Sequence, residues 1–249
     1  MSGHSKWASI KHKKALVDAK RGQAFTKFIR EITVAAKSGG GDPNTNPRLR
    51  TAIQSAREAN MPADNIDRAI KKGTGELEGV SYEEVTYEGF GSEGTAVLVA
   101  CLTDNKNRSA SEIRSVFNKN GGNMGGAGAV AWMFEKKGLM VIQKSATTED
   151  QLMEIVLGAG AEDMSSTDQV FEVITATHDL WTVREAVEKA GIKVESANLT
   201  MIPKNMVKVS ADTGRTVLKL IEALEDHDDV QNVYSNADIP DEVMKEIAG

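Results

Sequence analysis

Positively charged side chains interleaved with a tryptophan, near residue 1, are the residues best suited to binding a partner. This cluster consists of His4, Lys6, Trp7, Lys11, His12, Lys13, Lys14, Lys20 and Arg21. Cationic side chains neutralise the phosphates of a nucleic acid and release its condensed counterions, and an indole ring can stack on an unpaired base. A basic arm that only keeps the chain soluble is the alternative interpretation.

The distribution of charge along the chain favours the nucleic-acid interpretation. Residues 1–79 contain 15 Lys/Arg and 8 Asp/Glu, a net charge of +7. The whole chain has a net charge of −6, so the other 170 residues carry −13 and do not need these lysines for solubility. Further cations extend the predicted nucleic-acid contacts: Lys27, Arg30, Arg50 and Arg57. Arg50 and Arg57 are seven positions apart and therefore share one face of a helix.

Two polar segments in the middle of the chain contain candidate contacts of a different kind. The segment TDNKNRSASEIR is predicted to open a helix, with Ser109 as the N-cap and Glu112 completing a capping box. This prediction leaves three polar residues without a role, and they are candidate loop contacts: Asn105, Asn107 and Arg108. The next segment, NKNGGNMGGAGAVAWMF, adds the candidates Asn120 and Asn123.

The same glycine-rich segment contains Gly126-x-Gly128-x-x-Ala131, a superficial match to a dinucleotide-binding fingerprint. That fingerprint follows a strand and opens a helix, whereas this one follows a predicted helix and opens a predicted strand. We therefore predict a tight glycine-rich turn and no cofactor. A loop that packs against RNA or protein is the alternative interpretation.

No set of residues in the sequence points to catalysis or metal binding. Cys101 lies in the apolar run TAVLVACL and is predicted to be a small buried hydrophobe. His178 and His227 have no partner at ligand spacing, and the carboxylates of residues 222–229 are predicted to form a solvated helix end. The sequence therefore predicts a protein that is not an enzyme and has no metal site and no small-molecule substrate.

Membrane and secretory locations are disfavoured. No apolar stretch approaches the ~20 residues of a membrane helix, and the early lysines are not followed by the apolar segment of a signal peptide. A single cysteine cannot form an internal disulfide, which favours a reducing compartment. We predict a cytoplasmic protein.

The hydrophobic pattern predicts an α+β scaffold to position these residues. Apolar residues from Phe25 to Ala36 recur at helical spacing, a second helix follows the Asn46 cap, and a third begins at Pro62. From residue 81 onward, predicted strands are interspersed with helices. AVAWMF and GLMVIQK are predicted as two separate strands, and the tail after residue 204 is predicted to contain one helix and one strand.

These patterns predict three domains. Residues 1–79 form a basic three-helix domain, residues 80–134 with 204–249 form a discontinuous α+β domain, and residues 135–203 form a second α+β domain inserted in it. The tail is too short to bury a core alone, and it supplies the helix and strand that residues 80–134 lack. A linear order of domains is the alternative.

Taken in order, a series of motifs resembles the YebC/PmpR family. The motifs are GHSKWASIKHKK, KRGQAFTKFIREI, GGGDPNTNPRLR, YEGFG, TDNKNRSASEIRSVFNKNGGNMG, WMFEKKG, AGAED, MIPKN and LEDHDDVQNVY. The resemblance spans nearly the whole chain and implies a helical N-terminal domain followed by two α+β domains of the ferredoxin-like βαβ type. It also implies binding through the shared N-terminal motif, at Lys6, Trp7, Lys11, Lys13, Lys14, Lys20 and Arg21.

Members of the family are described as DNA-binding transcriptional regulators, and relatives, including mitochondrial ones, act as translation factors at the ribosome on difficult stretches such as proline runs. The resemblance therefore implies a non-enzymatic regulator of gene expression that binds nucleic acid, with DNA as the first target. A ribosome-associated factor contacting ribosomal RNA is the alternative, because the sequence has no clear recognition helix with base-reading Arg/Asn pairs. A small-molecule-binding α+β protein is the third hypothesis.

Overall fold

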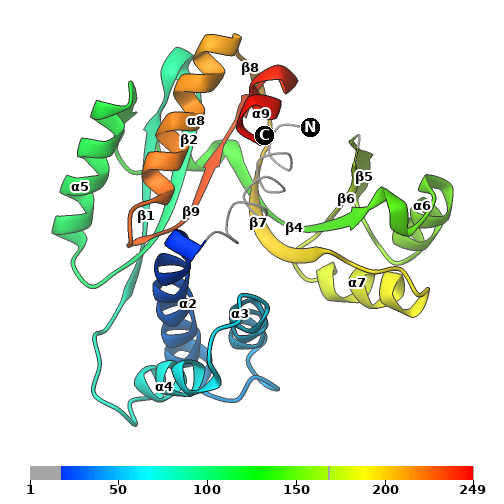
Figure 1. Ribbon diagram of the computed structural model, residues 1–249, viewed down its shortest axis with the longest axis horizontal. Helices are drawn as coiled ribbons and strands as arrows, with labels where there is room; N and C mark the ends of the chain where they lie inside the picture. Colours follow the sequence, from blue (N-terminus) through cyan, green and yellow to red (C-terminus); the bar gives the residue numbers. More distant parts are fainter. Residues whose placement is uncertain (1–17, 168, 249) are drawn as a thin grey trace.

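The computed structural model describes residues 18–167 and 169–248 (Figure 1). Its helices are α2 (Asp18–Gly39), α3 (Pro47–Glu58), α4 (Ala63–Thr74), α5 (Lys106–Lys119), α6 (Glu149–Gly158), α7 (Leu180–Lys189), α8 (Ala211–Glu225) and α9 (Asp241–Ala248). Its strands are β1 (Glu83–Phe90), β2 (Ala96–Thr103), β3 (Asn123–Met124), β4 (Phe134–Gln143), β5 (Asp163–Ser166), β6 (Val170–Thr175), β7 (Ser196–Pro203), β8 (Val207–Lys208), β9 (Val230–Ser235) and β10 (Ala237–Asp238). The fold is α+β, with a helical region followed by sheet-containing units, as predicted.

Helices α2, α3 and α4 form the helical region and share an aliphatic core. Asn46 caps α3, and its Nδ2 also donates to the main-chain oxygen of Ala35 on α2 at 2.8 Å. Pro47 occupies the first turn, where its fixed φ and missing N–H are tolerated. Gly73 permits α4 to approach α2, because a Cβ there would lie 2.4 Å from the main-chain oxygen of Thr33. The three predicted helices are confirmed, and their buried core includes Ile32, Ala36, Leu49, Ile53, Ala56, Ile66 and Ala69.

The first sheet has the strand order β3-β1-β2-β9, and all its pairings are antiparallel. Helices α5 and α8 lie side by side on one face, around a core that includes Phe117 and Leu220 (Figure 1). On the other face, Leu98 packs against Val130 and Phe134 at the start of β4. This sheet therefore has a second, smaller core on the side away from α5 and α8.

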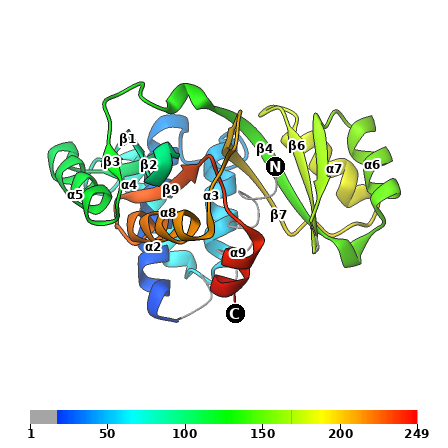
Figure 2. The same ribbon diagram turned by 90° about the horizontal axis from the view of Figure 1, so that it is seen from above.

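The second sheet has the order β5-β6-β4-β7 and is also antiparallel. Helices α6 and α7 pack on it around Leu152, Val173 and Val183. Figure 2 shows β4 and β7 as long strands that reach from the side of the first sheet to these helices. No described helix has the length and apolarity needed to cross a membrane.

The prediction of separate strands at AVAWMF and GLMVIQK is wrong. Residues Ala131–Met133 form a short 3-10 turn, and Phe134–Gln143 form the single strand β4. Gly138, between the two apolar runs, does not interrupt the strand, because it is buried where a Cβ would lie 2.3 Å from Oγ1 of Thr175 on β6. The glycine leaves room for the side chains of Thr175 and Leu180 and does not mark a turn.

The tail contains more structure than predicted. Besides α8 and β9 it forms the helix α9 and the two-stranded parallel pair of β8 and β10. Val243 and Met244 of α9 are buried in the core of the first sheet. The short amphipathic pattern of α9 becomes a stable helix because this tertiary packing supports it.

The tail after residue 204 pairs with the first sheet and not with the second. Strand β9 from the tail pairs with β2, whereas β4, β5, β6 and β7 form a sheet of their own. The division of the chain into 1–79, 80–134 with 204–249, and 135–203 stays a prediction.

Candidate nucleic-acid interface

Most of the predicted basic cluster lies outside the described residues. Lys6, Trp7, Lys11, His12, Lys13 and Lys14 belong to that part of the chain. Lys20 and Arg21 lie in the first turn of α2. The contact of all these residues with nucleic acid therefore stays a prediction.

Helix α3 carries two predicted contacts that the structure places on the surface. Arg50 and Arg57 are both exposed, and neither forms an ion pair with a described residue. The buried side of α3 is made by Leu49, Ile53 and Ala56, which pack into the helical core. The two guanidinium groups are therefore available to an external anion.

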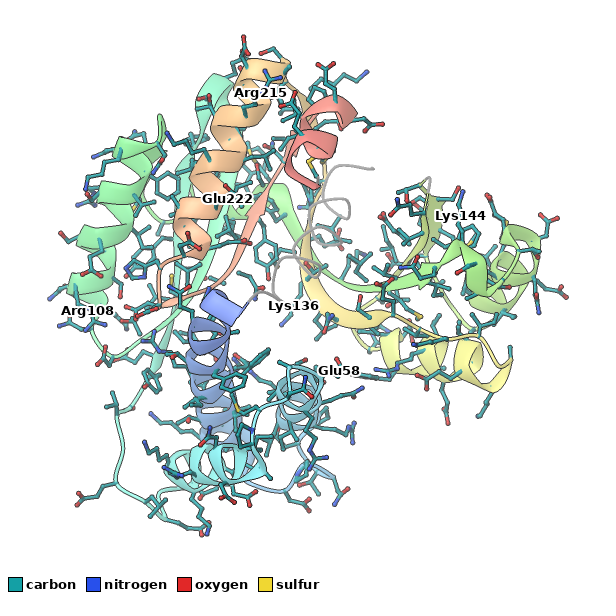
Figure 3. All side chains as sticks on the ribbon, in the orientation of Figure 1. Glu58, Arg108, Lys136, Lys144, Arg215 and Glu222 are labelled. Atoms are coloured by element: carbon teal, nitrogen blue, oxygen red, sulfur yellow. The ribbon has the colours of Figure 1, made fainter. Side chains whose placement is uncertain are left out.

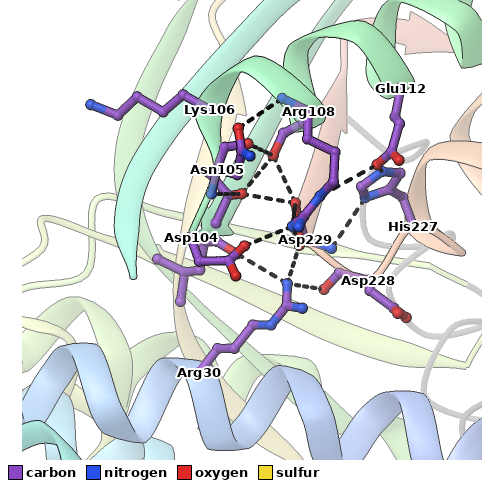
Figure 4. A network of polar contacts seen from close by, with 12 residues as sticks. Arg30, Asp104, Asn105, Lys106, Arg108, Glu112, His227, Asp228 and Asp229 are labelled. Carbon is purple, nitrogen blue, oxygen red and sulfur yellow. Dashed lines mark hydrogen bonds and ion pairs between the residues drawn. The ribbon is translucent and has the colours of Figure 1, made fainter. Parts of the chain in front are cut away.

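Lys27 and Arg30, by contrast, are engaged within the chain. Nζ of Lys27 donates to the main-chain oxygen of Glu225 at the end of α8, at 2.6 Å. Nη1 of Arg30 donates to a main-chain oxygen at the end of β2 (3.1 Å) and to that of Asp228 (2.8 Å), and it pairs with the carboxylate of Asp229 (Figure 4). Lys27 thus attaches α2 to the end of α8, and Arg30 attaches it to the first sheet and to the turn before β9.

The carboxylate of Asp229 is the centre of this attachment. It lies immediately before β9, and its side chain is 2% exposed. Its oxygens accept hydrogen bonds from Oγ1 of Thr103 (2.9 Å), Oγ of Ser109 (2.7 Å) and Nη2 of Arg108 (3.1 Å), in addition to Arg30. Elements α2, β2, α5 and the turn before β9 therefore converge on one anion.

These contacts keep Asp229 ionised despite its burial. Burial by itself disfavours the charged form of a carboxyl group. The hydrogen bonds from Ser109, Thr103, Arg30 and Arg108 outweigh burial and lower the pKa of Asp229 to about 2. At neutral pH the carboxylate therefore carries the charge that holds Arg30.

We expect acidification to destabilise the protein through Asp229. The pKa in the folded state, about 2, lies below the ordinary value of 3.8, so the unfolded chain takes up the proton first. The stabilisation is complete above about pH 4 and is lost as the pH falls toward 2, by about 2 kcal/mol for a shift of this size. Urea unfolding from pH 7 to pH 2 measures it, and Asp229→Asn should lack this portion of the pH dependence. Parallel curves for the two proteins would contradict the prediction.

The prediction of a solvated helix end at residues 222–229 is wrong for Asp229, which is buried. His227, two positions earlier, extends the network of Asp229 to α5. Nδ1 of His227 accepts the main-chain N–H of Asp229 at 3.1 Å, so the neutral ring carries its proton on Nε2. Nε2 lies 2.8 Å from Oε2 of Glu112 on α5, to which it donates (Figure 4). The turn between α8 and β9 is therefore bound to α5 as well as to α2.

The prediction that Ser109 is the N-cap of α5 is wrong, because Ser109 is an interior residue of that helix. The cap is Asn105, whose Oδ1 accepts the main-chain N–H of Arg108 at 3.1 Å. The Ser109 hydroxyl is buried and donates to Asp229, so its role depends on a residue far away in the sequence. Two of the three candidate loop contacts, Asn105 and Arg108, thus have partners within the chain, and Asn107 is exposed.

The predicted tight turn in the glycine-rich segment is confirmed, and it surrounds an internal anion. The carboxylate of Glu88 on β1 accepts the main-chain N–H groups of Gly128, Val130 and Ala131, each at 2.7 Å. Burial opposes the ionisation of Glu88, but these three bonds lower its pKa. Gly128 has a φ of +83°, a conformation that favours glycine. Three of the N–H groups with which such a loop could hold a phosphate are therefore already bound to Glu88.

The two remaining candidate contacts, Asn120 and Asn123, both lie before this loop in the chain. Nδ2 of Asn120 donates to the main-chain oxygen of Val116 at 2.8 Å, at the end of α5. Asn123 is exposed on β3, at the edge of the first sheet. Asn123 is the better placed of the two for an external partner.

Other reactive side chains in the described residues have no arrangement suited to chemistry. Within residues 18–167 and 169–248, no group of three His, Cys, Asp or Glu side chains is placed to hold a metal ion. Cys101 is buried, as predicted, and burial together with the charge of Asp229 raises the pKa of its thiol to about 12. A thiol with this pKa is not a nucleophile at neutral pH.

The fold and the site define an α+β protein in which internal ion pairs attach a basic helical region to an acidic body. The TACO1/YebC protein N-terminal domain matches residues 5–76, and the TACO1/YebC second and third domain matches residues 82–237. The chain belongs to the TACO1/YebC family.

Relatives match over almost their whole length. A probable transcriptional regulatory protein from Desulfatibacillum aliphaticivorans is 59% identical over 246 residues, which cover 99% of this chain and 100% of the relative. Another from Geobacter sulfurreducens is 59% identical over 247 residues, with 99% and 100% covered. The crystal structure of a conserved hypothetical protein from Aquifex aeolicus is similar with a TM-score of 0.83 and 48% identity, covering 91% of this chain and 94% of that one.

Proposed function

We propose that this protein is a non-enzymatic, cytoplasmic regulator of gene expression that binds nucleic acid through its basic N-terminal region. The observation that carries the proposal is the segregation of charge, with +7 on residues 1–79 and −13 on the rest of a chain of net charge −6. The names of the relatives, probable transcriptional regulatory proteins, make DNA the first target. The cytoplasmic location rests on the single cysteine, which favours a reducing compartment.

In this proposal the nucleic acid lies on the side of the helical region that has no internal contacts through Lys27 and Arg30. Lys27 and Arg30 turn one side of α2 toward the end of α8 and the end of β2. The exposed cations Arg50 and Arg57 on α3, and the basic residues preceding α2 in the sequence, are left for phosphates. The net negative charge of the acidic body repels a polyanion, so most of its surface should face protein or solvent.

A ribosome-associated role on structured RNA is the second candidate function. Helix α2 is the longest described helix, but the attachment through Lys27 and Arg30 keeps one side of it against the first sheet. Such a helix is poorly placed to lie in a major groove as a recognition helix does. Binding to backbone and shape, which structured RNA favours, agrees better with this arrangement.

Replacing Lys11, Lys13 and Lys14 together by alanine should weaken binding to duplex DNA and to structured RNA alike. Each lost phosphate contact should reduce the slope of log affinity against log salt by ~0.7–0.9. A salt titration by fluorescence anisotropy measures both quantities. The matched control neutralises three exposed lysines of the acidic body, Lys119, Lys193 and Lys219, and should leave affinity and slope nearly unchanged. Equal effects of the two triple variants would overturn the proposal.

Sucrose-gradient sedimentation of cell lysate at physiological salt separates the two targets. Co-migration with ribosomes that is lost in the Lys11/Lys13/Lys14 variant would support the RNA target. Migration at the top of the gradient, together with tight binding to duplex DNA, would support DNA.

A further inference from the structure

We propose that Trp132 and the glycine-rich loop before it form a second nucleic-acid contact, in which the indole stacks on an unpaired base. The inference deepens the proposed function and rests on it, since it concerns the same class of partner. It uses a surface formed by residues 125–132 together with Lys136 and Lys204, which we call the loop surface.

Trp132 is the most exposed of the large apolar side chains in the described residues, with 64% of its surface accessible. Its exposure does not come from a loose chain, because its Nε1–H donates to the main-chain oxygen of Ala129 at 3.3 Å. The N–H of Met133 donates to the main-chain oxygen of Val130 at 2.9 Å and closes the turn. The ring is therefore held at its Nε1–H edge, while most of its surface is accessible to solvent.

The base of the loop surface is rigid. Val130 is fully buried and Phe134 is 5% exposed, so the residues on both sides of Trp132 are fixed in the small core on the first sheet. The three hydrogen bonds to Glu88 fix the main chain just before the indole. A preorganised aromatic ring loses little conformational entropy when it binds.

Neither backbone conformation nor crowding within the chain requires a glycine at position 126. Gly128 has a positive φ, and a Cβ on Gly125 would lie 3.0 Å from that of Ala129, so conformation or crowding accounts for both. Gly126 has neither a positive φ nor any atom within 4 Å of a Cβ. A glycine in such a place is typical of a backbone that another molecule approaches closely.

The charge around the loop surface fits a polyanion. Lys204 is exposed, and its main-chain N–H donates to the oxygen of Met133 at 2.8 Å, next to Trp132. Lys136 is also exposed and lies on β4 between the first sheet and the unit of α6 and α7 (Figure 3). The one carboxylate in residues 121–137, Glu135, pairs with Lys137 at 3.0 Å. Residues 121–137 thus have a net charge of +1, whereas residues 80–249 carry −13. The carboxylate of Glu88 beneath the loop is buried and is bound by three main-chain N–H groups.

A single exposed indole next to a glycine-rich loop and to lysines favours a nucleic-acid strand over a protein as the partner. Protein interfaces concentrate their affinity in clusters of packed apolar residues. The large exposed apolar side chains that follow Trp132 in the described residues, Met153, Leu157 and Leu199, lie on α6 and β7 and not in the loop. Stacking of one base on one indole, with lysines near the phosphates, is the arrangement of single-strand binding sites.

Trp132→Ala should weaken binding to an RNA hairpin with an unpaired loop by about 5- to 150-fold, the range expected for one base–aromatic stack. Binding to blunt duplex DNA of the same length should not change, because it offers no unpaired base, and the salt slope should be unchanged because no cation is lost. Trp132→Phe should retain part of the affinity. Leu157→Ala, which removes an exposed apolar side chain from α6, is the control and should have no effect.

Gly126→Ala provides an independent test, because it adds a single methyl group where the chain has open space. We expect its melting temperature to equal or exceed that of the wild type and its affinity for the hairpin to fall severalfold. Gly158→Ala on α6, also with open space around it, is the matched control and should leave affinity unchanged.

The outcomes separate this inference from the proposed function. If the wild type binds neither RNA nor DNA in a salt-dependent way, the proposed function fails and this inference fails with it. If binding depends on Lys11, Lys13 and Lys14 but Trp132→Ala binds the hairpin as tightly as the wild type, only this inference is overturned. An equal loss on hairpin and blunt duplex would also overturn it, because stacking requires an unpaired base.

Discussion

Asp229→Ala is expected to lower the free energy of unfolding by about 3–5 kcal/mol, the range observed when one partner of a buried ion pair is removed. The side chain of Arg30 is 12% exposed and would lose its counterion. The buried hydroxyls of Thr103 and Ser109 would lose their acceptor at the same time. Urea unfolding at pH 7, followed by circular dichroism, measures the change.

Two further variants identify the origin of this loss. Asp228→Ala is the matched control: the neighbouring carboxylate is exposed, only its main-chain oxygen binds Arg30, and the change should stay within about 0.5 kcal/mol. Arg30→Ala combined with Asp229→Ala completes a double-mutant cycle. A coupling energy near zero would show that the pair does not act as a unit and would contradict this account of the attachment.

Asp229→Ala also tests how the helical region is attached to the rest of the protein. Asp229 joins Arg30 of α2 to Ser109 of α5 and Thr103 of β2. Its loss should therefore increase hydrogen exchange along α2 more than along α6 and α7, which do not contact it. Uniform changes along the chain would indicate a general loss of stability.

Glu88→Ala is expected to destabilise the protein by about 2–4 kcal/mol, because it leaves three main-chain N–H groups without their charged acceptor. Removing one partner of a buried hydrogen bond costs about 1–3 kcal/mol, and bonds to charged groups lie at the upper end. The N–H of Val130 is buried, and those of Gly128 and Ala131 are partly buried, so water replaces the carboxylate only in part. Urea unfolding measures the loss.

The control for Glu88 lies on the same face of the same strand. Glu84 pairs with Arg48 across the helical region and β1, but its side chain is 60% exposed. Glu84→Ala should therefore cost at most about 1 kcal/mol. Hydrogen exchange of Gly128, Val130 and Ala131 should accelerate in Glu88→Ala and not in Glu84→Ala. Unchanged exchange in both variants would contradict the role assigned to Glu88.

Local patterns predicted most helices and strands, because the forces that start and stop them act between near neighbours. Asn46 and Pro47 begin α3 through a cap and a fixed φ, both within one turn. Local patterns misled where two signals competed, as at Asn105 and Ser109, or where a glycine served packing, as at Gly138. A residue far away in the sequence takes part in both cases: Ser109 donates to Asp229, and Gly138 lies against Thr175.

The candidate site was predictable in its charge but not in the use of its cations. Lys27, Arg30, Arg50 and Arg57 are equivalent members of one basic segment in the sequence. The structure divides them into an internal pair and an exposed pair, and no spacing rule distinguishes the two. The buried carboxylate of Glu88 had a weak signal, an acid within a strand just before the glycines of YEGFG, and Asp229 had none within its acidic run.

The sequence by itself determined the segregation of charge, the three N-terminal helices and the α+β class, because composition and periodicity are properties of the chain before it folds. Only the tertiary structure decided which cations remain for a partner. Arg30 and Asp229 are 199 positions apart, and Ser109 and Asp229 are 120 apart. Contacts over such separations form only when sheets and helices pack. A charged side chain becomes internal because it is buried next to a specific partner, and not because of its residue type.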